Sequence, residues 1–130
     1  MNTYEDYLNH PAGDILTIED ALKIYGEVAD CVKKCTADFK GEIWQEFLTC
    51  AAEYTAIRNK WEHMSMEERI AEDERRTLKH DSFITKVNML SRMAEQDGVD
   101  NSWRAELGDA RKRIGDFACF VTYITGISNR

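Results

Sequence analysis

Four polar side chains of the C-terminal half could do acid–base chemistry together: His80, Asp81, Arg113 and Asp116. If the helices that carry them run antiparallel and turn near residue 99, residues equally far from that turn lie at one level. The four side chains would then come within about one turn of each other. Two carboxylates would raise the pKa of the histidine. The pattern predicts a polar cluster, which is either a buried structural network or a ligand or catalytic site.

Arg75 and His80, with four residues between them, match the spacing of the active motif in a class of helical-bundle ribonucleases. The chain is similar to those enzymes in size and in helical character. They place Asn, Asp or His directly after the arginine, whereas Arg76 stands there in this chain. The other interpretation of the two residues is a solvated charged helix with a capping histidine.

Four cysteines, Cys31, Cys35, Cys50 and Cys119, raise the question of a metal site. In an antiparallel bundle they would lie at heights from about 3 Å to about 30 Å above the turns. Four sulfurs spread in this way cannot surround one ion through bonds of about 2.3 Å. No histidine follows a glutamate by three positions, so the di-iron bundle motif is not present either. The sequence predicts no metal and no cofactor, and it indicates buried thiols in a reducing compartment.

The last segment, residues 102–127, carries small residues on the face opposite its apolar seam. Glycines inside a helix cost about 1 kcal/mol each relative to alanine, and small residues let another backbone approach closely. From residue 117 the segment is apolar nearly all round, which four helices of one chain hardly bury. We therefore expect a homo-oligomer, most simply a dimer, or else residues 1–14 folded across this face. The expected interface residues are Gly108, Gly115, Cys119, Phe120, Tyr123 and Gly126.

The elements that would position these residues are helices, because apolar residues recur at helical spacing and no strand-like alternation persists. Helix-start signals occur at Thr17, at Asp38, at Ser65 and after Gly98. The fold class is all-α, an antiparallel up-down four-helix bundle in a single domain, residues 1–130. Residues 1–14 form an irregular lead-in to it. The expected helices are residues 17–36, 38–63, 65–97 and 102–127.

The third expected helix is too long for its partner. Residues 65–97 would span roughly 50 Å, whereas residues 38–63 would span about 39 Å. The third helix must therefore project beyond the bundle or break. We expect a break or kink near residues 79–82, where His80, Asp81 and Ser82 offer capping groups.

Composition and charge narrow the function classes. Apolar residues make up 43% and charged residues 32%, as in soluble globular domains. The net charge of −7 makes a nucleic acid unlikely as a partner. No apolar run is long enough for a membrane span, and the N-terminus does not resemble a signal peptide. We expect a cytoplasmic protein that does not bind membranes.

Three stretches resemble a family of small bacterial proteins of unknown function. They are His80-Asp-Ser-Phe-Ile84, Asn88-Met-Leu-Ser-Arg92 and Arg111-Lys-Arg-Ile-Gly-Asp-Phe-Ala118. The resemblance covers about the last 50 residues and implies a bacterial or phage source and a helical fold. It implies no activity.

The function that these patterns favour is non-enzymatic: a helical module that binds a protein partner, in a regulatory role, and also binds itself. The alternative is a small metal-independent ribonuclease that uses Arg75 and His80. An enzyme needs a cleft into which His80 opens, whereas a binding module needs an apolar outer patch.

Overall fold

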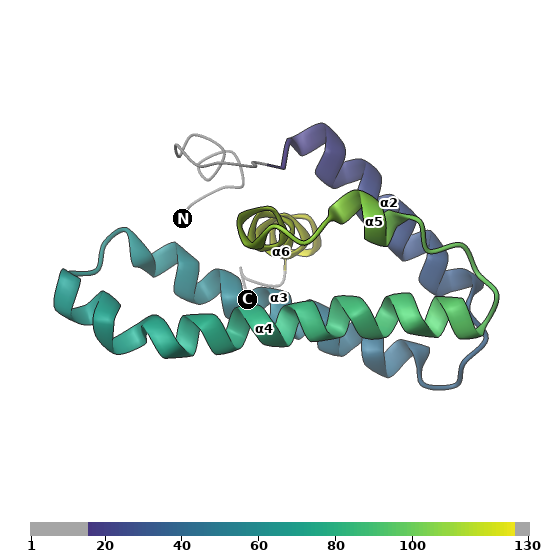
Figure 1. Cartoon of the computed structure of the whole chain (residues 1–130), viewed down its shortest axis with the longest axis horizontal. Coiled ribbons are helices and arrows are strands. Elements are labelled where there is room, and N and C mark those ends of the chain that lie inside the picture. The colour runs from purple at the N-terminus through teal and green to yellow at the C-terminus, as the bar shows by residue number, and fades with distance from the viewer. Residues whose placement is uncertain (1–15, 127–130) are drawn as a thin grey trace.

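The computed structural model describes residues 16–126, which form five helices and, within that range, no strand (Figure 1). The all-α class and the helical bundle are confirmed. In Figure 1, α3 and α4 lie side by side across the view and α6 is seen nearly end on, so a strict up-down order of antiparallel helices is not confirmed. The predicted lead-in, residues 1–14, lies outside the described residues. The helices are α2 (Ile18–Lys34), α3 (Lys40–Trp61), α4 (Met66–Gln96), α5 (Trp103–Leu107) and α6 (Arg111–Thr125).

Side chains cap two of the four helix starts that the sequence indicated, and α5 begins after Ser102 without a side-chain cap. The Thr17 side chain accepts a hydrogen bond at 3.1 Å from the amide three residues on. Ser65 begins α4 with a full capping box. The predicted cap at Asp38 is wrong, because α3 begins after Phe39 and no side chain caps it.

Asp97 joins the end of α4 to the connection between α2 and α3. Its Oδ2 accepts hydrogen bonds from the backbone amides of Thr36 and Ala37, at 2.9 and 3.1 Å. Asp97 lies about 60 residues from both in the chain, so this contact fixes one end of the bundle.

The core lies where α3, α4 and α6 meet. Phe47 of α3, Phe83 of α4 and Phe117 of α6 are fully buried, and their ring centroids lie 5.3 to 6.4 Å apart. Such a cluster contributes both buried area and ring–ring contacts. α2 buries Ile24 and Val28 against it and leaves Leu22 exposed.

α4 is one unbroken helix, so the predicted break near residues 79–82 is wrong. Two of the three residues that were expected to cap a break contact the α6 segment instead. A ring nitrogen of His80 bonds the carbonyl of Arg111, and Asp81 pairs with the Arg111 side chain. The extra length projects: the first turns of α4 and the end of α3 extend past α5 and α6 at the left of Figure 1.

The fourth expected helix is the one that breaks. α5 ends at Leu107 and is followed by Gly108, which has a φ of +76°, a conformation that favours glycine. The Arg104 guanidinium holds the turn, since it donates to the Gly108 carbonyl and to Asp109 Oδ1, each at 2.8 Å. The break lets α6 take a new direction across α3 and α4 (Figure 1).

Between residues 16 and 126, no helix combines the length and the apolar character that a membrane span requires.

Candidate functional site

The most deeply buried charge in the described chain is the carboxylate of Asp116, on α6, which is 1% exposed. Its Oδ1 pairs directly with the Arg58 guanidinium of α3, and Lys112 Nζ lies 3.6 Å from the same oxygen. Its Oδ2 accepts a hydrogen bond from the Leu16 amide at 3.3 Å. A carboxylate buried in this way needs such partners, because burying it alone would cost several kcal/mol.

The approach of α3 to α6 depends on Gly115. A Cβ atom at this position would lie 2.8 Å from Tyr54 Oη and 3.1 Å from Arg58 Nη1. Arg58 also donates to Cys119 Sγ at 3.6 Å. Burial raises the pKa of both the Tyr54 phenol and the Cys119 thiol, so both stay protonated at neutral pH. The arrangement is a dense structural network rather than an open site.

The four residues predicted to converge do not form one cluster. Asp116 lies in the network just described, and Arg113 donates to the Leu107 carbonyl at 3.0 Å. His80 and Asp81 both contact Arg111, through its carbonyl at 2.9 Å and its guanidinium at 3.3 Å. The predicted single cluster is therefore wrong, because the break before α6 shifts the register on which the prediction rested.

The His80 imidazole is 4% exposed, and its lowered pKa favours the neutral form at neutral pH. A carbonyl only accepts, so Nε2 carries the proton that bonds Arg111, and Nδ1 finds no hydrogen-bond partner among the described residues. Burial lowers the pKa of His80, the Arg111 carbonyl partly opposes this, and the charges of Arg111 and Arg76 lower it further. The pKa shift is opposite to the predicted one, because the effect of burial outweighs that of the Asp81 carboxylate, which acts to raise the pKa.

Acid is therefore expected to destabilise the fold through His80. Between pH 6.5, the ordinary pKa of histidine, and the lower pKa of His80 in the folded state, the unfolded chain binds a proton at this residue and the folded chain does not. The free energy of unfolding should fall as the pH drops through this window, by at most about 1.4 kcal/mol per pH unit. Urea unfolding of the wild type and of His80→Gln at several pH values measures the difference. If the unfolding free energy of both proteins depended on pH in the same way, the link between His80 and acid destabilisation would be contradicted.

Arg75 and His80 do not form a joint site. Residues five apart on a helix point about 140° away from each other. Arg75 is exposed and lies 3.7 Å from Glu72, whereas His80 is buried against Tyr54, with ring centroids 5.2 Å apart. The predicted ribonuclease pair is thus divided between the surface and the interior.

The predicted interface on the last helix is covered within the chain at three of its positions. Gly115 faces α3, Cys119 contacts Arg58, and Phe120 is 3% exposed and packs against Tyr25. The expectation that these three residues face a second subunit is therefore wrong.

The remaining positions of that interface serve other purposes. Gly108 and Gly126 are helix ends, each with a positive φ. Tyr123 is 47% exposed, whereas Gly108 and Gly126 are half-buried. The small residues that the sequence assigned to a dimer contact thus serve helix ends and the α3 contact.

The cysteines carry no pattern of metal ligands in the described chain. Cys31, Cys35 and Cys119 are buried and Cys50 is half-buried, all as free thiols. Burial raises the pKa of Cys35 to about 11, so its reactive thiolate is scarce at neutral pH. No three His, Cys, Asp or Glu side chains between residues 16 and 126 are placed to hold a metal ion.

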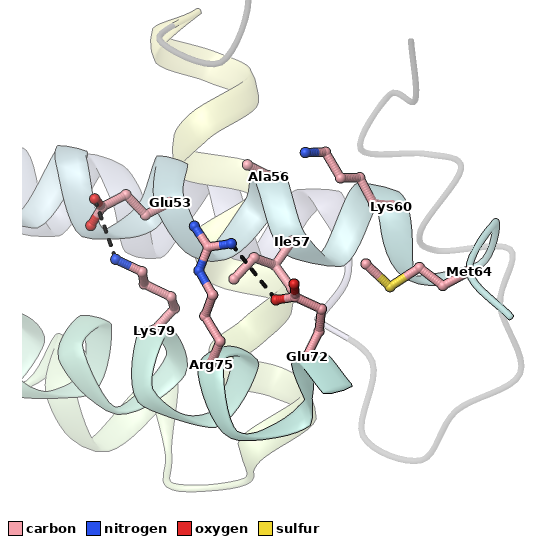
Figure 2. A pocket seen from close by; sticks show the side chains of 8 residues that line it. All are labelled: Glu53, Ala56, Ile57, Lys60, Met64, Glu72, Arg75 and Lys79. Carbon is pink, nitrogen blue, oxygen red and sulfur yellow. Dashed lines mark ion pairs between the residues drawn. The ribbon is translucent and has the colours of Figure 1, made fainter. Parts of the chain in front are cut away.

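A groove lies between α3 and α4, with a volume of about 250 Å³ (Figure 2). Its apolar lining comes from Ala56 and Ile57 of α3 and from Met64 of the loop after it. Charged side chains line the remainder, namely Glu53 and Lys60 from α3 and Glu72, Arg75 and Lys79 from α4. Figure 2 shows the Arg75 guanidinium reaching from α4 toward α3, with Lys60 beyond Ala56 and Ile57.

Sequence reasoning missed Arg58 and the groove. Arg58 lies four residues after Tyr54 and three after Thr55, on a row of α3 that is otherwise apolar or small. A charge in that row is the signal that could have identified it, because a buried arginine needs an acidic partner. The groove gives no comparable signal, since its charged lining looks like any solvated helix face.

Comparison of the chain with protein-family models, with curated proteins and with solved structures found no match. The similarity of residues 80–118 to small bacterial proteins therefore stays a resemblance, and the function must be argued from the surface itself.

Proposed function

We propose that this protein is a non-enzymatic helical module that binds a partner protein through the outer face of α4. We define the outer face as the exposed row Glu67, Ile70, Ala71, Glu74 and Leu78. These residues follow helical spacing and point away from α3. The proposal is supported above all by two aliphatic side chains that the fold leaves in water.

Exposure on the outer face is high. Ile70 is 71% exposed and Leu78 is 58% exposed, and the neighbouring Met66 is 69% exposed. Single exposed apolar residues are ordinary, but three within four turns of one projecting helix make an apolar patch. Burying an aliphatic side chain contributes about 1.5–3 kcal/mol, which a partner could gain here.

Charge on the outer face specifies the partner. Among the described residues, neither Glu67 nor Glu74 has an ion-pair partner, and both lie beside the aliphatic side chains. A basic amphipathic helix would place its own apolar stripe on Ile70 and Leu78 and its lysines or arginines on the acids. A second copy of the chain would oppose acid to acid on this face, so we favour a different protein as partner.

A model peptide tests this proposal. A helical peptide of leucine and lysine, apolar on one side, should bind the wild type at near-physiological ionic strength, where long-range attraction is screened. The double variant Ile70→Ser/Glu74→Gln should weaken binding about tenfold or more, because an aliphatic contact and a charge pair are lost. Fluorescence anisotropy of a labelled peptide measures both affinities.

The matched control is Leu22→Ser/Glu19→Gln on α2, which also removes one exposed aliphatic side chain and one exposed acid. This variant should bind the peptide as the wild type does. Equal weakening by both double variants would show nonspecific attraction to an acidic protein. A second peptide, in which glutamate replaces each lysine, should bind more weakly. If it bound the wild type as tightly as the leucine–lysine peptide does, the charge argument would be contradicted.

Self-association remains a prediction of the sequence, although three of its six expected interface residues are covered within the chain. Sedimentation at micromolar and near-millimolar concentrations decides whether a dimer forms. The ribonuclease alternative has less support, because Arg75 and His80 point to different regions.

A further inference from the structure

We infer that the groove between α3 and α4 binds a small organic carboxylate with a short apolar chain. The groove lies on the side of α4 away from the outer face, since Glu72, Arg75 and Lys79 line it and Ile70 and Leu78 do not. The inference therefore stands or falls independently of the proposed partner binding.

The apolar part of the ligand would rest on the bottom of the groove. Ile57 is only 6% exposed, Ala56 adds little bulk, and Met64 closes one end (Figure 2). Methionine adapts its shape readily, which suits a flexible chain. A volume of about 250 Å³ is below the range of roughly 300–1,000 Å³ that is typical of pockets for drug-sized ligands, so the occupant is small.

The charged part of the ligand would be an anion, because cations exceed acids in the lining. Lys79 Nζ lies 3.5 Å from Glu53, and Arg75 Nη1 lies 3.7 Å from Glu72. Lys60 has no ion-pair partner among the described residues. Three cations against two acids leave one positive charge for a ligand to neutralise.

The Arg75 guanidinium is available for exchange. Its side chain is 64% exposed and its contact with Glu72 is long, and exposed pairs of this kind contribute little to stability. A ligand carboxylate could replace Glu72 on the guanidinium, in a bidentate contact, while gaining Lys60 as a second partner. Together with the apolar contacts, these two charges define the expected ligand: a carboxylate that carries several methylene groups.

Octanoate is the probe, used below its micelle-forming concentration. Titration should shift the methyl resonances of Ile57 and Met64 in NMR spectra of the full chain, and the shifts should saturate. The double variant Lys60→Gln/Arg75→Gln should bind octanoate about tenfold more weakly or worse, because two charged hydrogen-bond donors are lost. Both substitutions lie on exposed or half-exposed helix positions, and circular dichroism checks that the helices are retained.

Two controls separate this site from general adhesion of an alkyl chain. Lys33→Gln/Lys34→Gln on α2 removes the same charge elsewhere and should leave the affinity unchanged. Octylamine carries the same chain with the opposite charge and should not bind. The inference is overturned if octylamine produces the same shifts, if both double variants lose equal affinity, or if octanoate shifts neither methyl group.

Discussion

Replacing Asp116 by alanine is expected to lower the free energy of unfolding by about 3–5 kcal/mol. The substitution leaves the Arg58 guanidinium, only 11% exposed, without its buried carboxylate. It also removes a carboxylate oxygen that accepts a hydrogen bond from the Leu16 amide, and the acid beside Lys112. Removing one member of a buried ion pair costs far more free energy than the intact pair contributes, because the remaining charge stays in the protein interior, which solvates it poorly. Chemical denaturation monitored by circular dichroism measures the change.

Removing both charges is the informative control for that substitution. The double variant Arg58→Met/Asp116→Leu should be more stable than Asp116→Ala alone, since it leaves no buried charge of this pair. A loss below about 1 kcal/mol for Asp116→Ala would mean that water reaches the pair and that the network is not structural.

Gly115→Leu is expected to destabilise the folded monomer by about 1–3 kcal/mol, because it overpacks a tight contact. The Cβ atom alone would meet the Tyr54 hydroxyl at 2.8 Å. Tyr54 is 7% exposed and Arg58 is held by Asp116, so neither side chain can give way cheaply. The same substitution in a dimer contact would separate subunits and leave the monomer folded. Thermal unfolding combined with light scattering distinguishes the two results.

Gly26→Leu on α2 is the matched substitution. Nothing lies within 4 Å of a Cβ atom there, and the glycine is inside a helix. Leucine should therefore stabilise the protein by up to about 1 kcal/mol through helix propensity. Similar unfolding free energies for the two leucine variants would show that the α3–α6 contact is loose.

Much of the fold could be predicted from apolar spacing and capping residues. The first three helices begin and end within about two residues of the predicted bounds, as expected when Thr17 and Ser65 act as caps. The break was assigned to the wrong helix because its two signals are ambiguous in sequence. His80 and Asp81 can cap a helix end or reach another helix, and Gly108 can be a contact or a terminator.

The site could be predicted only in part, for a related reason. Asp116 and His80 belong to the polar cluster that the sequence predicts, and both are buried. The partners of these residues depend on how α6 lies across α3. That direction follows from the positive φ of Gly108, which no periodic pattern in the sequence indicates. Arg58 therefore stayed unassigned, although it is the direct partner of Asp116.

The hydrogen bond from Leu16 to Asp116 joins residues 100 positions apart, and this separation bears on the order of folding. α3 and α4 are joined by a short loop and make the most extensive helix pair, so their association costs little chain entropy. The Leu16 contact needs nearly the whole described chain to be in place before it forms. A contact that forms this late stabilises the native state but not the transition state for folding. Its loss should therefore accelerate unfolding and leave the folding rate nearly unchanged.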